Sequence, residues 1–204
     1  ETDVVTVSGK EIVYKRYLYI MMNKPQGYVC STDDNTAPTV IDLLPDDLKR
    51  KGLFPAGRLD KDTEGFVLIT DDGEFAHDIL SPAKHVAKKY LCRLEKKAEK
   101  EYENAFLSGI TISGGEECKP ASIEFTDDEN LVYLTIFEGK FHQIKRMFEA
   151  VGNRIIYLKR LSIGGLFLDE NLALGECREI LHKEIEKRGA FFGIIFVRRN
   201  IRRP

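Results

Sequence analysis

The sequence predicts an α+β protein built on a mainly antiparallel sheet. Runs of β-forming residues recur along the chain, and two other segments place apolar residues at helical spacing. Strands and helices do not follow the strict alternation that a parallel sheet requires. The composition, 43% hydrophobic and 31% charged over 204 residues, is that of a soluble globular protein with one substantial core or two small ones.

The first predicted elements are strands. Residues Val4 to Ile12 contain a Ser-Gly turn between two short β-forming runs, which predicts a strand, a turn and a second strand. An apolar run from Tyr17 to Met22 predicts the next strand. We expect it to end at Asn23-Lys24-Pro25, because proline cannot donate the next ladder hydrogen bond.

The middle of the chain predicts a strand, a helix and a second strand. Residues 66–70 are a continuous apolar strand that Asp72-Gly73 interrupts. Phe75, Ile79 and Leu80 then recur at helical spacing until Ser81-Pro82 stops the helix. In the strand predicted at 86–95, apolar positions alternate with polar ones, so Tyr90 and its neighbour Lys89 face opposite sides of the sheet.

The last third of the chain predicts three strands around one helix. Residues 131–137 are rich in β-forming residues and predict a buried strand. A turn at Glu138-Gly139 then leads into a helix that Gly152-Asn153 ends. Two further strands are predicted at 154–158 and 162–168. The apolar face of the helix consists of Ile144, Met147, Phe148 and Val151.

Charge is segregated along the chain although the net charge is only −2. Residues 139–160 contain six Lys or Arg and one acid, whereas residues 60–78 contain seven acids and one lysine. A nucleic acid would therefore be bound locally, not by a global field. Basic runs are often solvated faces, but interleaved Phe141, His142 and Tyr157 favour contact with phosphates and bases.

Cysteine and apolar patterns exclude several classes of protein. The four cysteines have neither a C-x-x-C pair nor histidines at zinc-ligand spacing, so we expect reduced thiols in a cytoplasmic protein and no metal site. No glycine-rich nucleotide loop is present, so we expect no cofactor. The longest apolar run, residues 190–197, is far shorter than the about 20 residues that span a bilayer, and we expect no membrane association.

One motif carries the chemistry. Gly57-Arg58-Leu59-Asp60 places a carboxylate in a short glycine-flanked loop beside a buried strand, with an arginine two positions earlier. That arrangement suits an acid that works against an anionic polymer, although a G-x-x-D turn before a strand is also common by chance. The motif therefore needs support from the rest of the chain.

The motif continues in Asp62-Thr63, Gly65 and Thr70-Asp71-Asp72-Gly73. Together these residues resemble the signature of the RsuA family of ribosomal pseudouridine synthases. Three further blocks of that family follow in the same order, and the resemblance spans roughly residues 17–181. It implies a two-lobed pseudouridine synthase fold with the active site in the central cleft, and a catalytic domain over 17–181. The further blocks are Asn23-Lys24-Pro25-Gln26-Gly27, Lys88-Lys89-Tyr90-Leu91 and the run from Glu138 to Met147.

The resemblance assigns the reacting group to Asp60, as a nucleophile or as a base on the sugar. Burial alone would raise the pKa of a carboxyl group in a cleft, so a cation must keep it ionised. Lys145 holds the family's position for that cation; otherwise it is a solvent-facing helix lysine.

Three residues are implied to hold the target nucleotide. Tyr90 matches the tyrosine that stacks on the uracil, although an aromatic on a half-buried strand is usually part of a core. Arg58 matches a residue that holds the nucleotide extruded, with a plain phosphate contact as the alternative. Ile163 matches an aliphatic residue under the base, and as a lone strand isoleucine it would be core.

The remaining expectations concern RNA contacts. We expect contacts from five basic residues: Lys88, Lys89, His142, Arg146 and Arg160. His142 and Gln143 either bond RNA or cap the strand-to-helix turn. The motif at Asn23-Lys24-Pro25 is expected to brace the catalytic loop without a role in the chemistry.

Within the family, the chain is most similar to the enzyme that modifies small-subunit rRNA. The expected reaction is isomerisation of uridine 516 of 16S rRNA, offered as rRNA or as a partly assembled small subunit, by a monomer. A 23S rRNA target and a catalytically silent rRNA-binding assembly factor are the alternatives. Residues 1–16 are expected to be the tail of an N-terminal RNA-binding domain or a linker, and 182–204 a basic C-terminal tail of unknown role.

Overall fold

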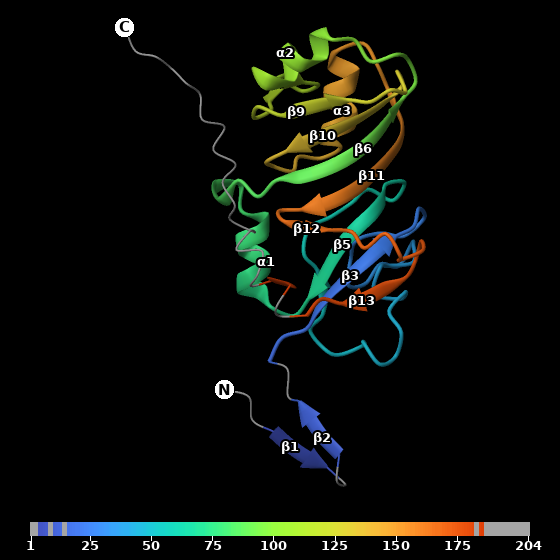
Figure 1. The fold of residues 1–204 in the computed structure, drawn as a ribbon, viewed down its shortest axis with the longest axis vertical. Helices are drawn as coiled ribbons and strands as arrows, with labels where there is room; N and C mark the ends of the chain where they lie inside the picture. Colours follow the sequence, from blue (N-terminus) through green and yellow to red (C-terminus); the bar gives the residue numbers. More distant parts are fainter. Residues whose placement is uncertain (1–3, 8–9, 14–15, 182–183, 186–204) are drawn as a thin grey trace, which may run out of the picture.

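A nine-stranded mixed sheet organises the molecule (Figure 1). The computed structural model describes residues 4–7, 10–13, 16–181 and 184–185. Within these residues, two short strands lie beside the main path of the sheet. β4 (Phe54–Pro55) pairs with β5, and β12 (Leu166–Phe167) pairs with β11. In order across the sheet, that path is β13 (Cys177–Glu179), β3 (Tyr19–Lys24), β5 (Glu64–Thr70), β11 (Ile155–Ile163), β6 (Lys88–Leu94), β10 (Leu131–Ile136) and β9 (Ser122–Phe125).

The sheet has two halves that meet between β5 and β11. In the described sheet every strand pairing is antiparallel except this one, which is parallel and joins Glu64 to Lys159 and Gly65 to Arg160. Gly65 has a φ of +102°, and a Cβ there would lie 2.7 Å from the backbone nitrogen of Arg160 and closer still to its oxygen. Only glycine lets the two strands approach in this way. The predicted α+β, mainly antiparallel architecture is confirmed.

Both predicted helices are present. The first, α1 (Gly73–Leu80), begins where the Asp72 carboxylate accepts a hydrogen bond from the Phe75 amide at 3.0 Å, and it covers one face of the sheet (Figure 1). The second, α3 (Gln143–Ala150), buries Ile144, Met147 and Phe148 as the spacing predicts. A further helix, α2 (Glu101–Leu107), was not predicted. Its two buried aromatics lie four residues apart within a strongly charged segment, which weakens the amphipathic signal.

Two strand predictions need correction. The strands predicted at 154–158 and 162–168 are a single strand, β11, which continues through an irregularity between Arg160 and Ser162 before the short β12. Sequence patterning places a break there because two cations interrupt the apolar run. The strand predicted at Tyr17 to Met22 is β3, which runs from Tyr19 to Lys24, so Asn23 and Lys24 still pair in the ladder.

Smaller elements complete the described chain. The N-terminal strands β1 (Val4–Val7) and β2 (Lys10–Val13) pair antiparallel, as predicted, in a sheet of their own. A 3-10 turn at Pro82–Lys84 follows α1, and β7 (Thr111–Ile112) pairs with β8 (Glu116–Glu117). The expected C-terminal tail lies outside the described residues apart from 184–185.

Two apolar clusters lie on the sheet. The larger contains side chains from both halves, among them Ile20, Val67, Cys92 and Phe148. The smaller packs Phe66, Leu68 and Ile163 with the buried side of α1. Because residues of β3 and β5 contribute alternately to the two clusters, these strands are buried on both faces and hold the loop before β5 in a fixed position.

Candidate active site

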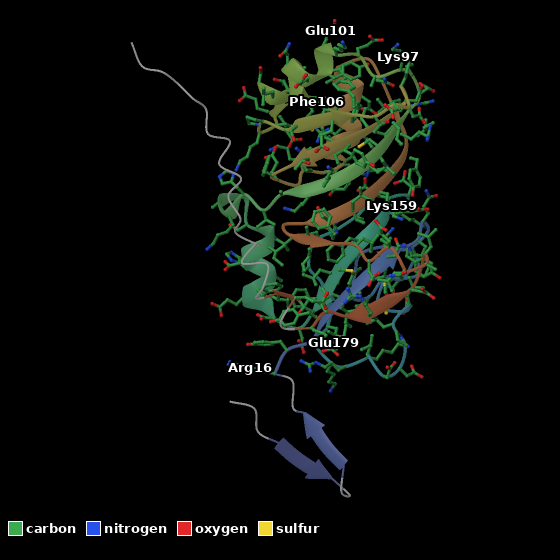
Figure 2. All side chains as sticks on the ribbon, viewed as in Figure 1. Arg16, Lys97, Glu101, Phe106, Lys159 and Glu179 are labelled. Atoms are coloured by element: carbon green, nitrogen blue, oxygen red, sulfur yellow. The ribbon has the colours of Figure 1, made fainter. Side chains whose placement is uncertain are left out.

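A cleft of about 780 Å³ lies where the two halves of the sheet meet. Its wall is formed by the loop before β5, by β6 and β11, and by the turn into α3. A smaller cavity of about 470 Å³ is lined by Lys97 and Glu101, which Figure 2 places at the outer end of the upper half, and by none of the predicted site residues. The larger cleft brings together seven of them: Arg58, Asp60, Lys88, Tyr90, His142, Lys145 and Arg160.

The loop that carries Asp60 is fixed from beneath. The amide of Leu59 donates to the Cys30 Sγ at 3.3 Å, and Lys24, which is fully buried, reaches under the loop. Burial lowers the pKa of Lys24, opposed by several nearby acidic groups. The predicted bracing role of this motif is confirmed. The Lys24 ammonium donates to the carbonyls of Pro25 (3.1 Å), Asp60 (3.1 Å), Lys61 (3.3 Å) and Thr63 (2.8 Å).

The Asp60 carboxylate lies between the side chains of Lys145, on α3, and His142, which precedes that helix. Its Oδ2 is 3.6 Å from the Lys145 Nζ, and its Oδ1 is 3.6 Å from the His142 Nε2. The carboxylate side chain is 29% exposed, so it is open to the cleft and not sealed in the core. A carboxylate that is open to a cleft can act as a nucleophile or as a base.

Lys145 is shared between two acids, which the sequence interpretation did not foresee. Its Nζ donates to both oxygens of Asp62 at 2.7 Å, so its hydrogen bonds go to Asp62 and its contact with Asp60 is an ion pair only. Partial burial would raise the pKa of Asp62, but the hydrogen bond and charge of Lys145 outweigh burial and hold that pKa below its ordinary value. The acidic loop and the basic helix are thus complementary across the cleft.

Tyr90 forms part of the cleft wall. It is 6% exposed and lies opposite Arg160 on the neighbouring strand. Lys88, two residues earlier on the same face of β6, donates to the Val86 carbonyl at 3.0 Å. Burial, and secondarily the charge of Arg160, lower the pKa of Lys88 from 10.5 to about 8.

Arg160 adds a second buried cation to this wall. Its Nε donates to the Phe66 carbonyl at 2.7 Å, whereas its buried Nη2 has no partner among the described residues. Neither Lys88 nor Arg160 has an acidic partner among the ion pairs of the described chain. Two such cations favour an anionic or carbonyl-rich ligand.

Three predicted site residues do not line the cleft. Lys89 points to the opposite face of β6, where it pairs with Glu124 at 2.8 Å, because neighbouring strand residues alternate in direction. Arg146 donates to Glu116 of β8 at 2.7 Å and does not line the cleft. Ile163 is 1% exposed and belongs to the smaller apolar cluster, so its place under a base stays a prediction.

Among the lining residues, Leu158 was not singled out from the sequence, whereas Gln143 and Arg58 were. Leu158 lines the cleft on β11 two residues before Arg160, and strand alternation from Arg160 would have found it. The Gln143 side chain accepts a hydrogen bond from the Lys140 amide at 2.9 Å. Of its two predicted roles, a bond to RNA or a cap of the strand-to-helix turn, the cap is therefore observed. Arg58 is exposed and has no polar partner in the described chain, so its side chain is available to a ligand.

Comparison with known proteins decides the family. The model of the RNA pseudouridylate synthase family matches residues 18–150. The chain belongs to this family. The uncharacterized RNA pseudouridine synthase YtzG of Bacillus subtilis (strain 168) is 48% identical over 188 residues, which cover 91% of this chain and 79% of that protein. The ribosomal small subunit pseudouridine synthase A of Haemophilus influenzae is 49% identical over 170 residues, 83% of this chain and 72% of that one.

The fold agrees with this assignment. A crystal structure described as that of a pseudouridylate synthase superposes with a TM-score of 0.79 at 44% identity, covering 90% of this chain and 82% of that one. The two-lobed pseudouridine synthase fold predicted from the motifs is confirmed, and the chain is an RNA pseudouridine synthase. In the described part of this synthase, no three His, Cys, Asp or Glu side chains are grouped as metal ligands, and no helix could cross a membrane.

Proposed function

We propose that this synthase converts uridine 516 of small-subunit (16S) ribosomal RNA into pseudouridine, with Asp60 as the reacting group. The target class is supported by relatives at 48% to 49% identity that are named ribosomal small subunit pseudouridine synthase A. The observation that carries the chemical assignment is the Asp60 carboxylate, which faces the cleft between Lys145 and His142. The partner is 16S rRNA or a partly assembled small subunit.

The reaction exchanges one bond for another without oxidation or reduction. The C1′–N1 bond of uridine breaks and its electron pair leaves with N1 of the uracil. An Asp60 oxygen either bonds to C1′ or removes a proton from C2′. The uracil turns, and its C5 bonds to C1′ as the Asp60–C1′ bond breaks or as the proton returns to C2′. The proton on C5 is then lost and N1 gains a proton, which gives the product.

The other lining residues have roles that follow from their places. Lys145 and His142 orient the Asp60 carboxylate, since each lies 3.6 Å from one of its oxygens. Tyr90 offers a flat face that retains the detached base through its turn, whereas directional hydrogen bonds would resist that turn. Lys88 and Arg160 face the negative charge that develops on the departing uracil. Arg58 holds the emptied position of the extruded nucleotide.

A hydrogen-release assay tests the assignment of Asp60. Small-subunit rRNA with tritium at C5 of uridine should lose tritium to water with the wild type and not with Asp60→Asn, whereas the affinity for RNA stays nearly unchanged. Asp62→Asn is the matched control. It removes a carboxylate two residues away that holds the same lysine, and it should retain measurable turnover. Turnover of Asp60→Asn near the wild-type rate would remove Asp60 from the chemistry.

The choice of RNA is tested separately. Pseudouridines are mapped by chemical probing after incubation with 16S and 23S rRNA, both naked and in partly assembled particles. One new pseudouridine at position 516 of 16S rRNA is the expected product. A product in 23S rRNA would move the target to the large subunit and leave the mechanism intact. Binding without any product would identify a silent assembly factor.

A further inference from the structure

The ring of Phe141 is exposed at the cleft, and the proposed reaction gives it no role. Its relative exposure of 72% is the highest among the large exposed hydrophobic residues of the described chain. Single exposed apolar side chains are ordinary on a protein surface. Phe141 differs because it lines the cleft and is part of an ordered pair of rings.

The second ring of the pair is His142. The two ring centroids lie 3.8 Å apart with an interplanar angle of 19°, which is a stacked arrangement. His142 adopts φ +48° and ψ +33°, a left-handed conformation that costs a residue with a Cβ on the order of 1 kcal/mol. Such conformations persist where the surroundings impose them, and they cluster at functional sites.

Hydrogen bonds of Arg146 hold the backbone beside His142 in this conformation. The Arg146 Nη1 donates to the Phe141 carbonyl at 3.0 Å, and its Nε donates to the Ser113 hydroxyl at 3.0 Å. The Glu116 carboxylate fixes the same guanidinium. Arg146, which was expected to contact RNA directly, therefore anchors the backbone that carries Phe141.

The Phe141–His142 ring pair lies beside the reacting carboxylate, and this position indicates which part of a ligand it would contact. The imidazole of His142 lies 3.6 Å from Asp60, so the Phe141 ring stands one residue away from the reacting carboxylate. Tyr90, deep in the wall and 6% exposed, is placed to hold the target base, whereas Phe141 is at the solvent side. Lys140 and Lys145 flank the pair and line the same cleft. An exposed aromatic face among cations is the combination that binds single-stranded nucleic acid.

We propose that Phe141, supported by His142, is a stacking platform for an unpaired nucleobase adjacent to the target uridine. The RNA is then held at two bases, the target against Tyr90 inside the cleft and its neighbour on Phe141 outside. This inference rests on the proposed function, because it takes the ligand to be single-stranded RNA that presents a uridine to Asp60. It adds a subsite that acts on binding and on the choice of sequence context.

The absence of tryptophan from the sequence makes the platform directly observable. Phe141→Trp introduces a single indole at the platform. Phe167→Trp introduces one on β12, where the native ring is 57% exposed and does not line the cleft. Each variant is titrated with a short single-stranded RNA from the region around uridine 516, and binding is followed in parallel by anisotropy of a label on the RNA.

Stacking should quench the emission of Phe141→Trp as the RNA saturates and leave that of Phe167→Trp unchanged. Replacement of the base next to the target by an abasic site should abolish the quenching while anisotropy still reports binding. Emission of Phe141→Trp that stays constant with saturating RNA would overturn the proposal. Equal quenching in both variants would do so too, since it would come from general proximity.

Kinetics separate stacking from a structural role. Phe141→Leu should raise KM roughly tenfold, within the range for loss of one base–aromatic stack, with the saturated single-turnover rate within about twofold of wild type. Phe141→Tyr should restore KM. A lower saturated rate at unchanged KM would show that the ring acts by positioning His142, and would refute the platform. Quenching in a protein that forms no pseudouridine would refute the proposed function alone.

Discussion

Lys88→Met should make the protein more stable at neutral pH. Lys88 is 8% exposed, and burial followed by the charge of Arg160 lowers its pKa from 10.5 to about 8. This difference corresponds to roughly 3 kcal/mol of destabilisation when the side chain is charged in the fold. The substitution also removes the hydrogen bond to the Val86 carbonyl, worth about 1 kcal/mol, so a net gain of roughly 2 kcal/mol is expected at pH 7.

The pH dependence of this gain is the sharper test. A lysine whose pKa is lower in the folded state destabilises the fold fully below pH 8, and the penalty fades as pH rises from about 8 to 10.5. Urea unfolding of wild type and Lys88→Met is measured at intervals from pH 7 to 10.5, and the difference in unfolding free energy is plotted. The advantage of the variant should vanish across this window.

Lys89→Met is the matched control, one residue away on the same strand. Lys89 pairs with Glu124 on the opposite face with its side chain 27% exposed, so its loss should change stability by no more than about 1 kcal/mol. A constant stability difference between wild type and Lys88→Met at every pH would refute the reasoning. It would mean that Lys88 is solvated through the cleft and carries no charging penalty.

Three further outcomes are expected. Lys145→Met should lower turnover roughly tenfold by removing the ammonium group beside Asp60, and Lys145→Arg should retain more activity; equal loss in both would indicate packing. Gly65→Ala should lower the free energy of unfolding in urea by well over 2 kcal/mol because its Cβ meets the Arg160 backbone, whereas Gly27→Ala, with a φ of +91° and open space, should cost about 1 kcal/mol. Arg58→Gln should reduce the salt slope of rRNA affinity by about 0.7 to 0.9, and a slope equal to wild type would contradict a phosphate contact.

Local sequence patterns were sufficient for the elements that carry most of the fold. The alternation in β6 correctly separated Tyr90 from Lys89, because a strand has a period of two whatever surrounds it. Helical spacing likewise identified the buried face of α3. The pattern failed at β11, where Arg160 is buried against the Phe66 carbonyl, since an arginine in the sequence gives no sign of a partner 94 residues away.

The sequence by itself determined the family, the α+β class and the motif residues that reach the cleft. Motifs and periodicities are local properties, so they can be recognised without a three-dimensional structure. Tertiary structure decided which of those residues face one another. Lys145 is divided between Asp60 and Asp62, Arg146 is turned toward Glu116, and Ile163 is in the apolar core. Each outcome depends on a contact between segments that are distant in the sequence, as between Lys145 on α3 and a loop about 80 residues earlier, and packing between such segments sets the direction of a side chain.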